Sequence, residues 1–294
     1  MVKDTSVKDT SVKETLADAV KDFNVHLVQS KAPVYSIDSP FILSGYRSQM
    51  SFKECLVSMF YWHNQTMNIW TSFFLIVFNL WLTVHFTRSA EEMPQSFLAM
   101  FWFQGGLRAF CWYNSWVYHT FVPHSKQIAN LACQMDYFGC YLTPLGMGSN
   151  LLFIELSCHS EYRIALLCLG STGIFTSVVV SLLPHYQTES YRSIRMLISL
   201  ISTLPYLGGL VVAVVVVHRG TVPSYYQYLA YGVLCEVVAG MFYVSMFPEV
   251  SFPYVFDHWL SSHSVWHWLN FGFDACMMLL AYHAFDELNK GRIC

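Results

Sequence analysis

Charged residues are scarce in this chain of 294 residues. Asp, Glu, Lys and Arg make up 12% of the sequence, against roughly 25% in soluble domains. Hydrophobic residues make up 54% and aromatic residues 17%, and the mean hydropathy is +0.39. This composition excludes a soluble domain. We therefore expect an integral membrane protein that does not bind nucleic acid.

The N-terminal sequence also lacks the apolar core of a secretory signal peptide. It is polar and repetitive, since Val-Lys-Asp-Thr-Ser begins at Val2 and again at Val7, and Val-Lys-Glu-Thr follows at Val12. The first membrane span must therefore target the chain. We expect residues 1–39 to form a flexible, polar cytoplasmic tail with no chemical role.

The nine cysteines do not form a disulfide framework, because most of them fall within apolar segments, where cysteine acts as a small hydrophobic residue. Only Cys158 and Cys294 lie outside these segments, on the same side of the membrane. The sequence is compatible with a bridge between them and with two free thiols. The cysteines expected within apolar helices are Cys55, Cys111, Cys133, Cys140, Cys168, Cys235 and Cys276.

The sequence contains long apolar runs without charged residues. Residues 164–183 and 196–217 reach the ~20 residues that cross about 30 Å of hydrocarbon, without the alternation of barrel strands. We predict an all-α membrane protein, a seven-transmembrane helix bundle over residues 69–285, followed by a short tail over residues 286–294. The expected spans are 69–86, 97–119, 128–148, 164–183, 196–217, 225–247 and 262–285.

Residues 40–68 form a juxtamembrane segment with a helix signal of its own. Ser51 and Glu54 have the spacing of a capping box. The apolar residues that follow have the spacing of an amphipathic helix on the membrane surface, although a helix that continues into the first span fits equally well. These residues are Phe52, Cys55, Leu56, Met59 and Phe60.

Three histidines indicate a metal site, because ionisable residues within apolar spans are costly and mark functional positions. His263 and His267 lie one helical turn apart at the start of the last span, and His119 ends the second span. With seven spans, counting parity places all three at one membrane face. Three imidazoles at one depth match a catalytic zinc with an open fourth position. We therefore predict zinc as the cofactor, with these histidines as ligands.

Asp136 and Ser115 are candidates for chemistry at this zinc. Asp136 lies in the third span near the same face, either as a fourth ligand or as the residue that holds a zinc-bound water and acts as general base. Ser115, one turn before His119, orients that ring, contacts a bound carbonyl or bonds back to its own helix. The remaining histidines are expected to make only interfacial hydrogen bonds: His63, His85, His124, His159, His185, His218, His258 and His283.

Four formal charges fall deep within the spans, namely Arg108, Asp136, Glu236 and Asp274. Such charges are tolerated only if they pair or line a wet cavity. Arg108 and Asp274 each share a helical stripe with the histidines of their span. We expect Arg108 to pair with Asp274 or with Glu236.

The sequence at these positions resembles the progestin and adipoQ receptor family, whose members include adiponectin receptors and membrane progestin receptors. The motifs that carry the resemblance are Ser115-Trp-Val-Tyr-His119, Met135-Asp136-Tyr137 and Ser262-His263-Ser-Val-Trp-His267. Further matches extend it from about Pro40 to His283, and they are Pro40-Phe-Ile-Leu-Ser-Gly45-Tyr46-Arg47, His63-Asn64-Gln-Thr-Met-Asn68-Ile-Trp70-Thr71, Phe247-Pro248-Glu249, Phe252-Pro253 and Phe256-Asp257.

The resemblance implies a seven-helix receptor in the plasma membrane, with a cytoplasmic N-terminus, an extracellular C-terminus and zinc on His119, His263 and His267. Asp136 matches the aspartate that contacts the zinc-bound water. Similarity to alkaline ceramidases further implies hydrolysis of a lipid amide. We expect a signalling receptor for a lipid, steroid or adiponectin-like ligand, and the alternative is an intramembrane zinc-dependent lipid-amide hydrolase without a receptor role. The oligomeric state is not indicated.

Five positions depart from the family pattern, and none of them removes a proposed zinc ligand. They change the polar surroundings of the first span and of the sixth loop, so the resemblance does not transfer a particular member's ligand. The departures are Gln65 in place of Glu, Ser72 in place of His, Val250 in place of Arg, Tyr254 in place of Gly and Ser264 in place of Gln.

Overall fold

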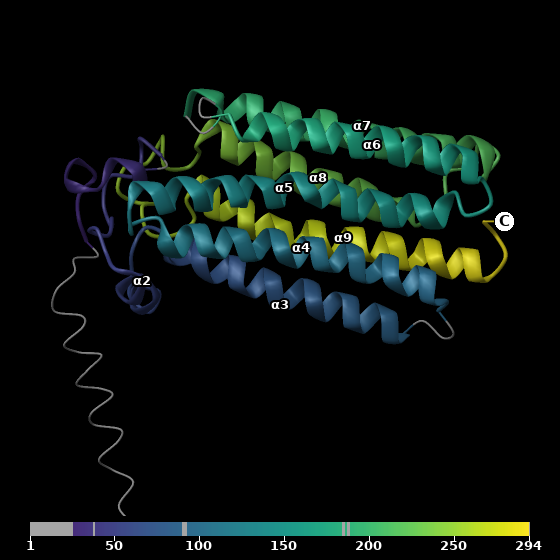
Figure 1. Ribbon diagram of the computed structural model, residues 1–294, viewed down its shortest axis with the longest axis horizontal. Coiled ribbons are helices and arrows are strands. Elements are labelled where there is room, and N and C mark those ends of the chain that lie inside the picture. The colour runs from purple at the N-terminus through teal and green to yellow at the C-terminus, as the bar shows by residue number, and fades with distance from the viewer. Residues whose placement is uncertain (1–25, 38, 90–92, 184–185, 187–188, 294) are drawn as a thin grey trace, which may run out of the picture.

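The computed structural model describes residues 26–37, 39–89, 93–183, 186 and 189–293. Within these residues, seven long α-helices run side by side and a short helix, α2, lies at one end of them (Figure 1). The predicted all-α membrane bundle is confirmed. The N-terminal repeat lies outside the described residues. The helices are α2 (Phe52–Ser58), α3 (Thr66–Ser89), α4 (Gln95–Phe121), α5 (Lys126–Glu155), α6 (Ser160–Ser181), α7 (Arg192–Val216), α8 (Tyr226–Ser245) and α9 (Ser262–Asn289).

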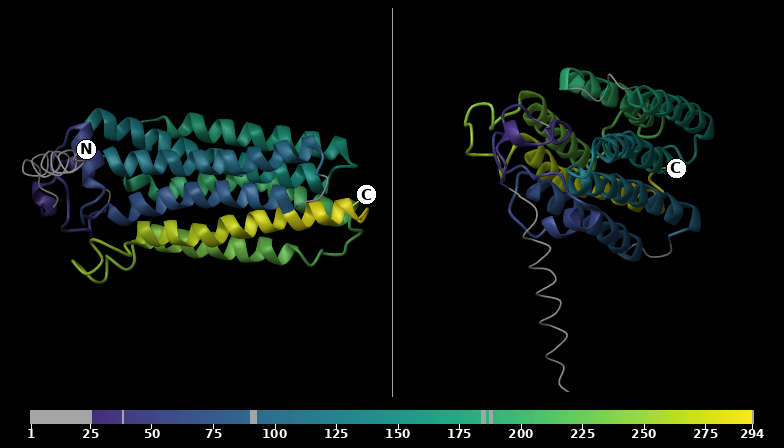
Figure 2. Two further views of the ribbon diagram at one scale, coloured as in Figure 1. Left: turned by 90° about the horizontal axis from the view of Figure 1, so that it is seen from below. Right: turned by 60° about the vertical axis from the view of Figure 1, so that its left-hand side comes forward.

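Helices α3 and α5 each pack on more than one other helix of the bundle. Helix α3 packs on both α4 and α9, and α5 packs on α4, α6, α7 and α9. Helix α9 begins at the end of the bundle where α2 lies and ends at the opposite end (Figure 2). The two helices that carry the predicted ligands, α4 and α9, are therefore held together by α3.

Four of the long helices are apolar enough by length and composition to cross a membrane, namely α3, α6, α7 and α8. Helices α4, α5 and α9 carry buried polar side chains such as Arg108, Asn150 and Asp274, which lower their hydropathy. On α6 and α7, large apolar side chains such as Phe175 and Val211 are exposed. That is the pattern of a bundle with a lipid-facing exterior and a polar interior.

Helix α5 extends to Glu155 rather than ending at residue 148 as predicted. Two polar residues in the additional turns, Asn150 and Glu155, are buried and have partners. Asn150 donates to the side-chain oxygen of Gln104 over 2.7 Å. The Glu155 carboxylate accepts from the Tyr225 hydroxyl over 2.8 Å and contacts His218 Nε2 at 2.8 Å. These partners remove the cost of burying polar groups.

The predicted capping box of α2 is confirmed, because the Ser51 backbone N–H donates to Glu54 Oε2 over 2.6 Å and the Glu54 N–H donates to Ser51 Oγ over 3.4 Å. The helix ends at Ser58 and α3 begins at Thr66, so the two are separate. Met59 and Phe60 lie just beyond the end of the helix, and an amphipathic helix on the membrane surface stays a prediction. Cys55 and Met59 are buried, whereas Phe52, Leu56 and Phe60 are exposed.

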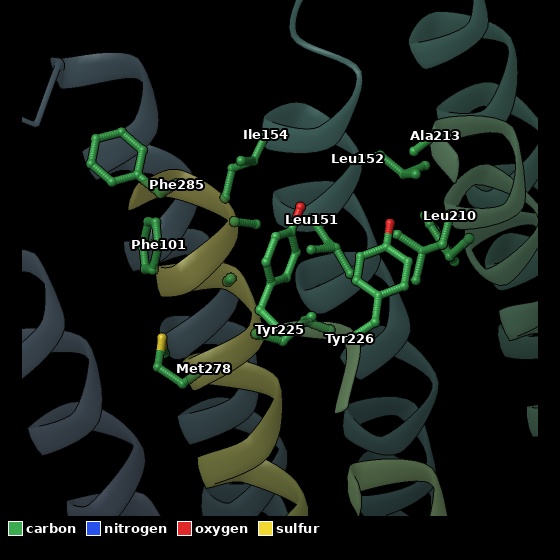
Figure 3. Close-up of a cluster of buried hydrophobic side chains, with 14 of the residues drawn as sticks. Phe101, Leu151, Leu152, Ile154, Leu210, Ala213, Tyr225, Tyr226, Met278 and Phe285 are labelled. Atoms are coloured by element: carbon green, nitrogen blue, oxygen red, sulfur yellow. The ribbon is translucent and has the colours of Figure 1, made fainter. Parts of the chain in front are cut away.

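Polar and apolar side chains are segregated along the bundle. A cluster of buried apolar residues fills the half in which α9 ends (Figure 3). It includes Phe101, Leu151, Tyr226, Met278 and Phe285. The other half buries histidine, serine, threonine and amide side chains. The three histidines therefore lie at the end of the bundle opposite the larger apolar cluster.

The seven cysteines expected within apolar helices are free, which confirms that they form no disulfide framework. Cys158, in the loop between α5 and α6, is disulfide-bonded. Cys294 lies outside the described residues.

Candidate metal centre

The three predicted histidines meet. His119 lies in the last turn of α4, and His263 and His267 lie in the first two turns of α9. One ligand nitrogen from each lies within 4.8 Å of the others, and the ring centroids are 4.9–5.3 Å apart. His119 and His267 are buried. The predicted convergence is confirmed, and zinc ligation by these rings stays a prediction.

The His119 ring is held at one nitrogen and free at the other. Its Nδ1 lies 2.8 Å from Gln65 Oε1, and the same oxygen accepts from Asn68 Nδ2 over 2.9 Å. Because an amide oxygen only accepts, Nδ1 must carry the proton. Nε2 is buried without a hydrogen-bond partner among the described residues. Its lone pair is directed to the histidine cluster.

The His267 ring is held in the same way. Its Nδ1 lies 2.9 Å from Thr71 Oγ1 and 3.3 Å from Ser72 Oγ. The Thr71 hydroxyl donates to the backbone oxygen of Met67 over 2.6 Å, so its oxygen accepts from the ring. The proton therefore lies on Nδ1, and the lone pair lies on Nε2.

This donor set fits zinc. Zinc prefers tetrahedral nitrogen ligands at about 2.0–2.1 Å, which places two ligand nitrogens roughly 3.3 Å apart, so small torsional changes bring the cluster into range. A buried nitrogen without a partner is unusual in a protein interior. Bound zinc would satisfy His119 Nε2 and leave one position open.

The N-terminus of α9, which presents His263, is capped from the preceding loop. Ser261 is the N-cap residue, and its hydroxyl accepts from the Ser264 N–H over 3.5 Å. The buried Glu249 carboxylate accepts from the Ser262 N–H over 2.7 Å and from its hydroxyl over 2.6 Å. A carboxylate at this position also complements the helix dipole. The first turn of α9 is therefore fixed from two sides.

The C-terminus of α4, which presents His119, is capped by Arg47. The buried guanidinium donates to the backbone oxygens of His119 over 2.5 Å and Thr120 over 3.0 Å, and to Ser58 Oγ over 2.9 Å. Burial lowers the pKa of Arg47 to about 10, so the side chain stays charged at neutral pH. The cation satisfies the last carbonyls of α4 and joins α2 to the site.

Asp136 lies at the level of Ser115 but outside the ligand cluster. A side chain at Gly139 would meet Cys111 and Asn114 of the antiparallel α4, which places Asp136, one turn earlier in α5, beside the next turn of α4. Among the described residues, its carboxylate makes no hydrogen bond or ion pair. The close group of nitrogens does not include it, so action through a water fits the geometry better than direct ligation.

The Ser115 hydroxyl is hydrogen-bonded to Ser72 Oγ at 3.1 Å, and Ser72 in turn contacts His267. Of the predicted alternatives, a bond back to its own helix is absent among the described residues. Ser115 joins α4 to α3 beside the cluster.

Arg108 pairs with Asp274, which confirms one of the two predicted partners. Arg108 Nε lies 2.5 Å from Asp274 Oδ1. Asp274 Oδ2 accepts from Asn79 Nδ2 over 2.7 Å and from the Trp112 indole over 3.2 Å. Arg108 also donates to Asn270. The Trp112 ring packs edge-on against His267, with centroids 5.1 Å apart, so this ion pair lies directly beneath the metal centre.

Two of the other histidines, His63 and His218, have partners elsewhere and do not belong to the ligand set. His63 accepts from the Gln65 N–H at Nδ1 over 3.1 Å and contacts the backbone oxygen of Ser58 at Nε2, also over 3.1 Å. Both of its nitrogens are occupied. Burial, and then the charge of Arg47, hold the pKa of His63 well below its ordinary value. His218 contacts Glu155, and His185 lies outside the described residues.

The residues of α3 that hold the two rings were not identified as site residues from the sequence. Gln65, Asn68 and Ser72 are spaced by three and four residues, and Thr71 adjoins them. This spacing forms one polar stripe at the start of an otherwise apolar helix, and it is the signal that would have identified them.

The fold and the site define a membrane protein with seven long helices and a three-histidine cluster near one end of the bundle. Residues 60–278 match the haemolysin-III related family. Because this match covers most of the chain, the protein belongs to that family.

Individual relatives confirm the resemblance to the progestin and adipoQ receptors. Progestin and adipoQ receptor-like protein 1 of Caenorhabditis elegans is 24% identical over 277 residues, which cover 89% of this chain and 60% of the relative. Heptahelical transmembrane protein 1 of Arabidopsis thaliana is 29% identical over 80% of this chain and 74% of its own length. Human progestin and adipoQ receptor family member 3 is 27% identical, with coverage of 84% and 80%. The chain spans less than two thirds of the nematode relative.

Proposed function

We propose that this protein is a zinc-containing signalling receptor of the progestin and adiponectin receptor type, responding to a lipid, steroid or adiponectin-like ligand. The observation that carries the zinc centre is the buried, unpartnered Nε2 of His119 beside His263 and His267. The receptor role is supported by family membership and by the relatives that are named as progestin and adipoQ receptors.

The same centre supports hydrolysis of a lipid amide. Zinc would be held by Nε2 of His119, Nε2 of His267 and one ring nitrogen of His263. When bound, zinc supplies Lewis-acid polarisation of a carbonyl and activation of water. Asp136, whose carboxylate has no hydrogen-bond or ion-pair partner within the described part of the chain, would accept the proton of the attacking water. Ser115 would orient the carbonyl through its hydroxyl.

We propose that the N-terminus is cytoplasmic and the C-terminus extracellular, in the plasma membrane. The disulfide-bonded Cys158 lies in a loop at the end of the bundle opposite the histidines. Disulfides persist in oxidising compartments. This supports an extracellular position for that end, and we propose a metal centre near the cytoplasmic face.

The second candidate function is a zinc-dependent lipid-amide hydrolase without a receptor role, which the unpaired Asp136 carboxylate favours. Fatty acid release from ceramide by the purified protein should be measured for the unmodified chain, Asp136→Asn and Glu236→Gln. Glu236 is a matched control because it is another membrane-embedded carboxyl group, located on α8. Turnover lost only in Asp136→Asn supports hydrolysis.

The receptor role is tested by a ligand-dependent cell response in the same variants. A response that survives Asp136→Asn supports a receptor that signals without hydrolysis. Zinc-dependent turnover with no response to any lipid, steroid or adiponectin-like ligand would replace the receptor proposal with the hydrolase.

A further inference from the structure

The start of α3 touches both buried ligand rings, although it supplies no ligand itself. Gln65 contacts His119 at 2.8 Å, and Thr71 contacts His267 at 2.9 Å. These contacts join residues that are 54 and 196 positions apart in the sequence. Helix α3 packs on both α4 and α9. One segment therefore controls the orientation of rings from two different helices.

Each acceptor is itself fixed by a second hydrogen bond. Asn68 Nδ2 donates to Gln65 Oε1, which turns the amide oxygen, rather than the NH₂ group, toward His119. The Gln65 backbone N–H donates to His63 Nδ1. The Thr71 hydroxyl proton is directed to the Met67 backbone oxygen. Neither acceptor can therefore become a donor to the ring without breaking a hydrogen bond of its own.

The tautomer of both rings follows from this arrangement. A proton held on Nδ1 leaves Nε2 with the lone pair that binds a cation. A hydrogen-bond partner on the second ring nitrogen also fixes the ring orientation and raises its basicity as a ligand. Without Gln65, the His119 ring would be free to carry its proton on Nε2, and without Thr71 the His267 ring would keep only Ser72 and the Asn68 backbone as partners from α3.

We propose that Gln65 and Thr71 are positioning residues for the metal centre, which hold the Nδ1 protons of His119 and His267 and thereby present both Nε2 atoms to the cation. This inference rests on the proposed zinc site. Both acceptors are uncharged. Ser72 is uncharged too, and its Oγ lies 3.3 Å from His267 Nδ1, on the same ring nitrogen as Thr71. A carboxylate at position 65 would accept the same hydrogen bond more strongly.

The test measures zinc affinity of the purified full-length chain by competition with a chelator, together with the pH at which half of the zinc is released. Gln65→Leu and Thr71→Val remove the acceptors with little change of volume. We expect each to weaken zinc binding about 10–100-fold and to raise the pH of half-release, because protons compete better with a weaker site. Gln65→Glu should bind zinc at least as tightly as the unmodified protein.

Two matched variants control for loss of a buried polar group. Thr83→Val makes the same change at a buried threonine further along α3, whose hydroxyl donates to the backbone oxygen of Asn79. Gln104→Leu removes a buried glutamine of α4 that accepts from Asn150. Both should keep the zinc affinity and half-release pH of the unmodified chain. Thermal unfolding of each zinc-free variant separates misfolding from a changed site.

The outcomes distinguish this inference from the zinc site on which it rests. If the unmodified protein binds no zinc, or His119→Ala binds it unchanged, the metal centre itself is wrong. If His119→Ala loses zinc but Gln65→Leu and Thr71→Val bind it as tightly as the two controls, the positioning role alone is overturned. If Gln65→Leu does not fold, Thr71→Val and the gain or loss in Gln65→Glu decide the question.

Discussion

At the scale of single residues, burial of charge is the dominant constraint on this bundle. Arg108 and Asp274 are almost fully buried, and every described contact of the Asp274 carboxylate is a donor from another helix or from Arg108. A buried pair is costly to desolvate, but loss of one partner leaves an uncompensated charge. The pair therefore fixes how α3, α4 and α9 meet below the metal centre.

Replacement of one partner should destabilise the protein strongly. We expect Asp274→Leu to lower the free energy of unfolding by roughly 3–5 kcal/mol, because the Arg108 guanidinium then loses the carboxylate that it contacts. The double variant Arg108→Met with Asp274→Leu should recover part of this loss. Thermal unfolding of the detergent-purified variants is the measurement. Single variants as stable as the unmodified protein would show that the pair has no structural role.

His63 gives the protein a defined response to acid. Its folded-state pKa lies well below the ordinary 6.5, chiefly because of burial. As the pH falls below 6.5, the unfolded chain takes up a proton at His63 and the folded chain does not, so stability decreases by up to about 1.36 kcal/mol per pH unit.

The comparison is with His63→Asn, whose side-chain oxygen can still accept from the Gln65 N–H. The variant should be less stable at pH 7.5, and it should lose less stability than the unmodified chain between pH 7.5 and 5.5. Unfolding curves at the two pH values measure both effects. An equal loss in the two proteins would assign the acid response to other groups.

At the scale of helices, the contact between α4 and α5 depends on one glycine. A Cβ at Gly139 would lie 2.8 Å from the Cα atom of Cys111, so only glycine permits this approach. Asp136 lies one turn away on the same helix. The close approach therefore sets the depth at which the carboxylate enters the site.

Gly139→Ala should force α4 and α5 apart, and the expected cost is about 1–3 kcal/mol. The matched control is Gly208→Ala on α7, where an added Cβ meets nothing within 4 Å, so the change should be neutral or slightly stabilising. Thermal unfolding compares the two. If both variants behave alike, the helices do not require this close contact.

The sequence predicts those features of the site that depend only on how deep a residue lies in the membrane. Counting parity placed His119, His263 and His267 at one face, because depth follows from position within a span. Parity says nothing of which helices are lateral neighbours, so Arg108 had two candidate partners until the packing of α3 with α4 and α9 was known. The role of Gln65 and Thr71 depends on which helices lie beside their polar stripe, and the sequence shows the stripe but not its neighbours.

The helix boundaries show a related limit. The span of α5 was predicted to end at residue 148, whereas the helix ends at Glu155. Tertiary partners for Asn150 and Glu155 allow the helix to continue, and such partners come from distant parts of the chain. Hydropathy thus located every long helix but not the ends that are stabilised by other helices.

At the scale of the whole molecule, the bundle combines an apolar half that packs like a core with a polar half that surrounds the three histidines. The apolar cluster joins the far ends of α4, α5 and α9 (Figure 3), and the caps at Arg47 and Glu249 fix the other end. A ligand or substrate would therefore react at the end of the bundle that holds the three histidines. We also expect loss of the metal to change the structure of the histidine end before that of the apolar half.

The most direct test of this account is the zinc content of the purified protein, determined by elemental analysis of the unmodified chain and of His119→Ala, His263→Ala and His267→Ala. We predict one zinc ion per chain in the unmodified protein and a large loss in each variant, with His218→Ala retaining zinc because His218 lies at the opposite end, paired with Glu155. A chain without zinc, or zinc that persists in all three variants, would contradict the central claim.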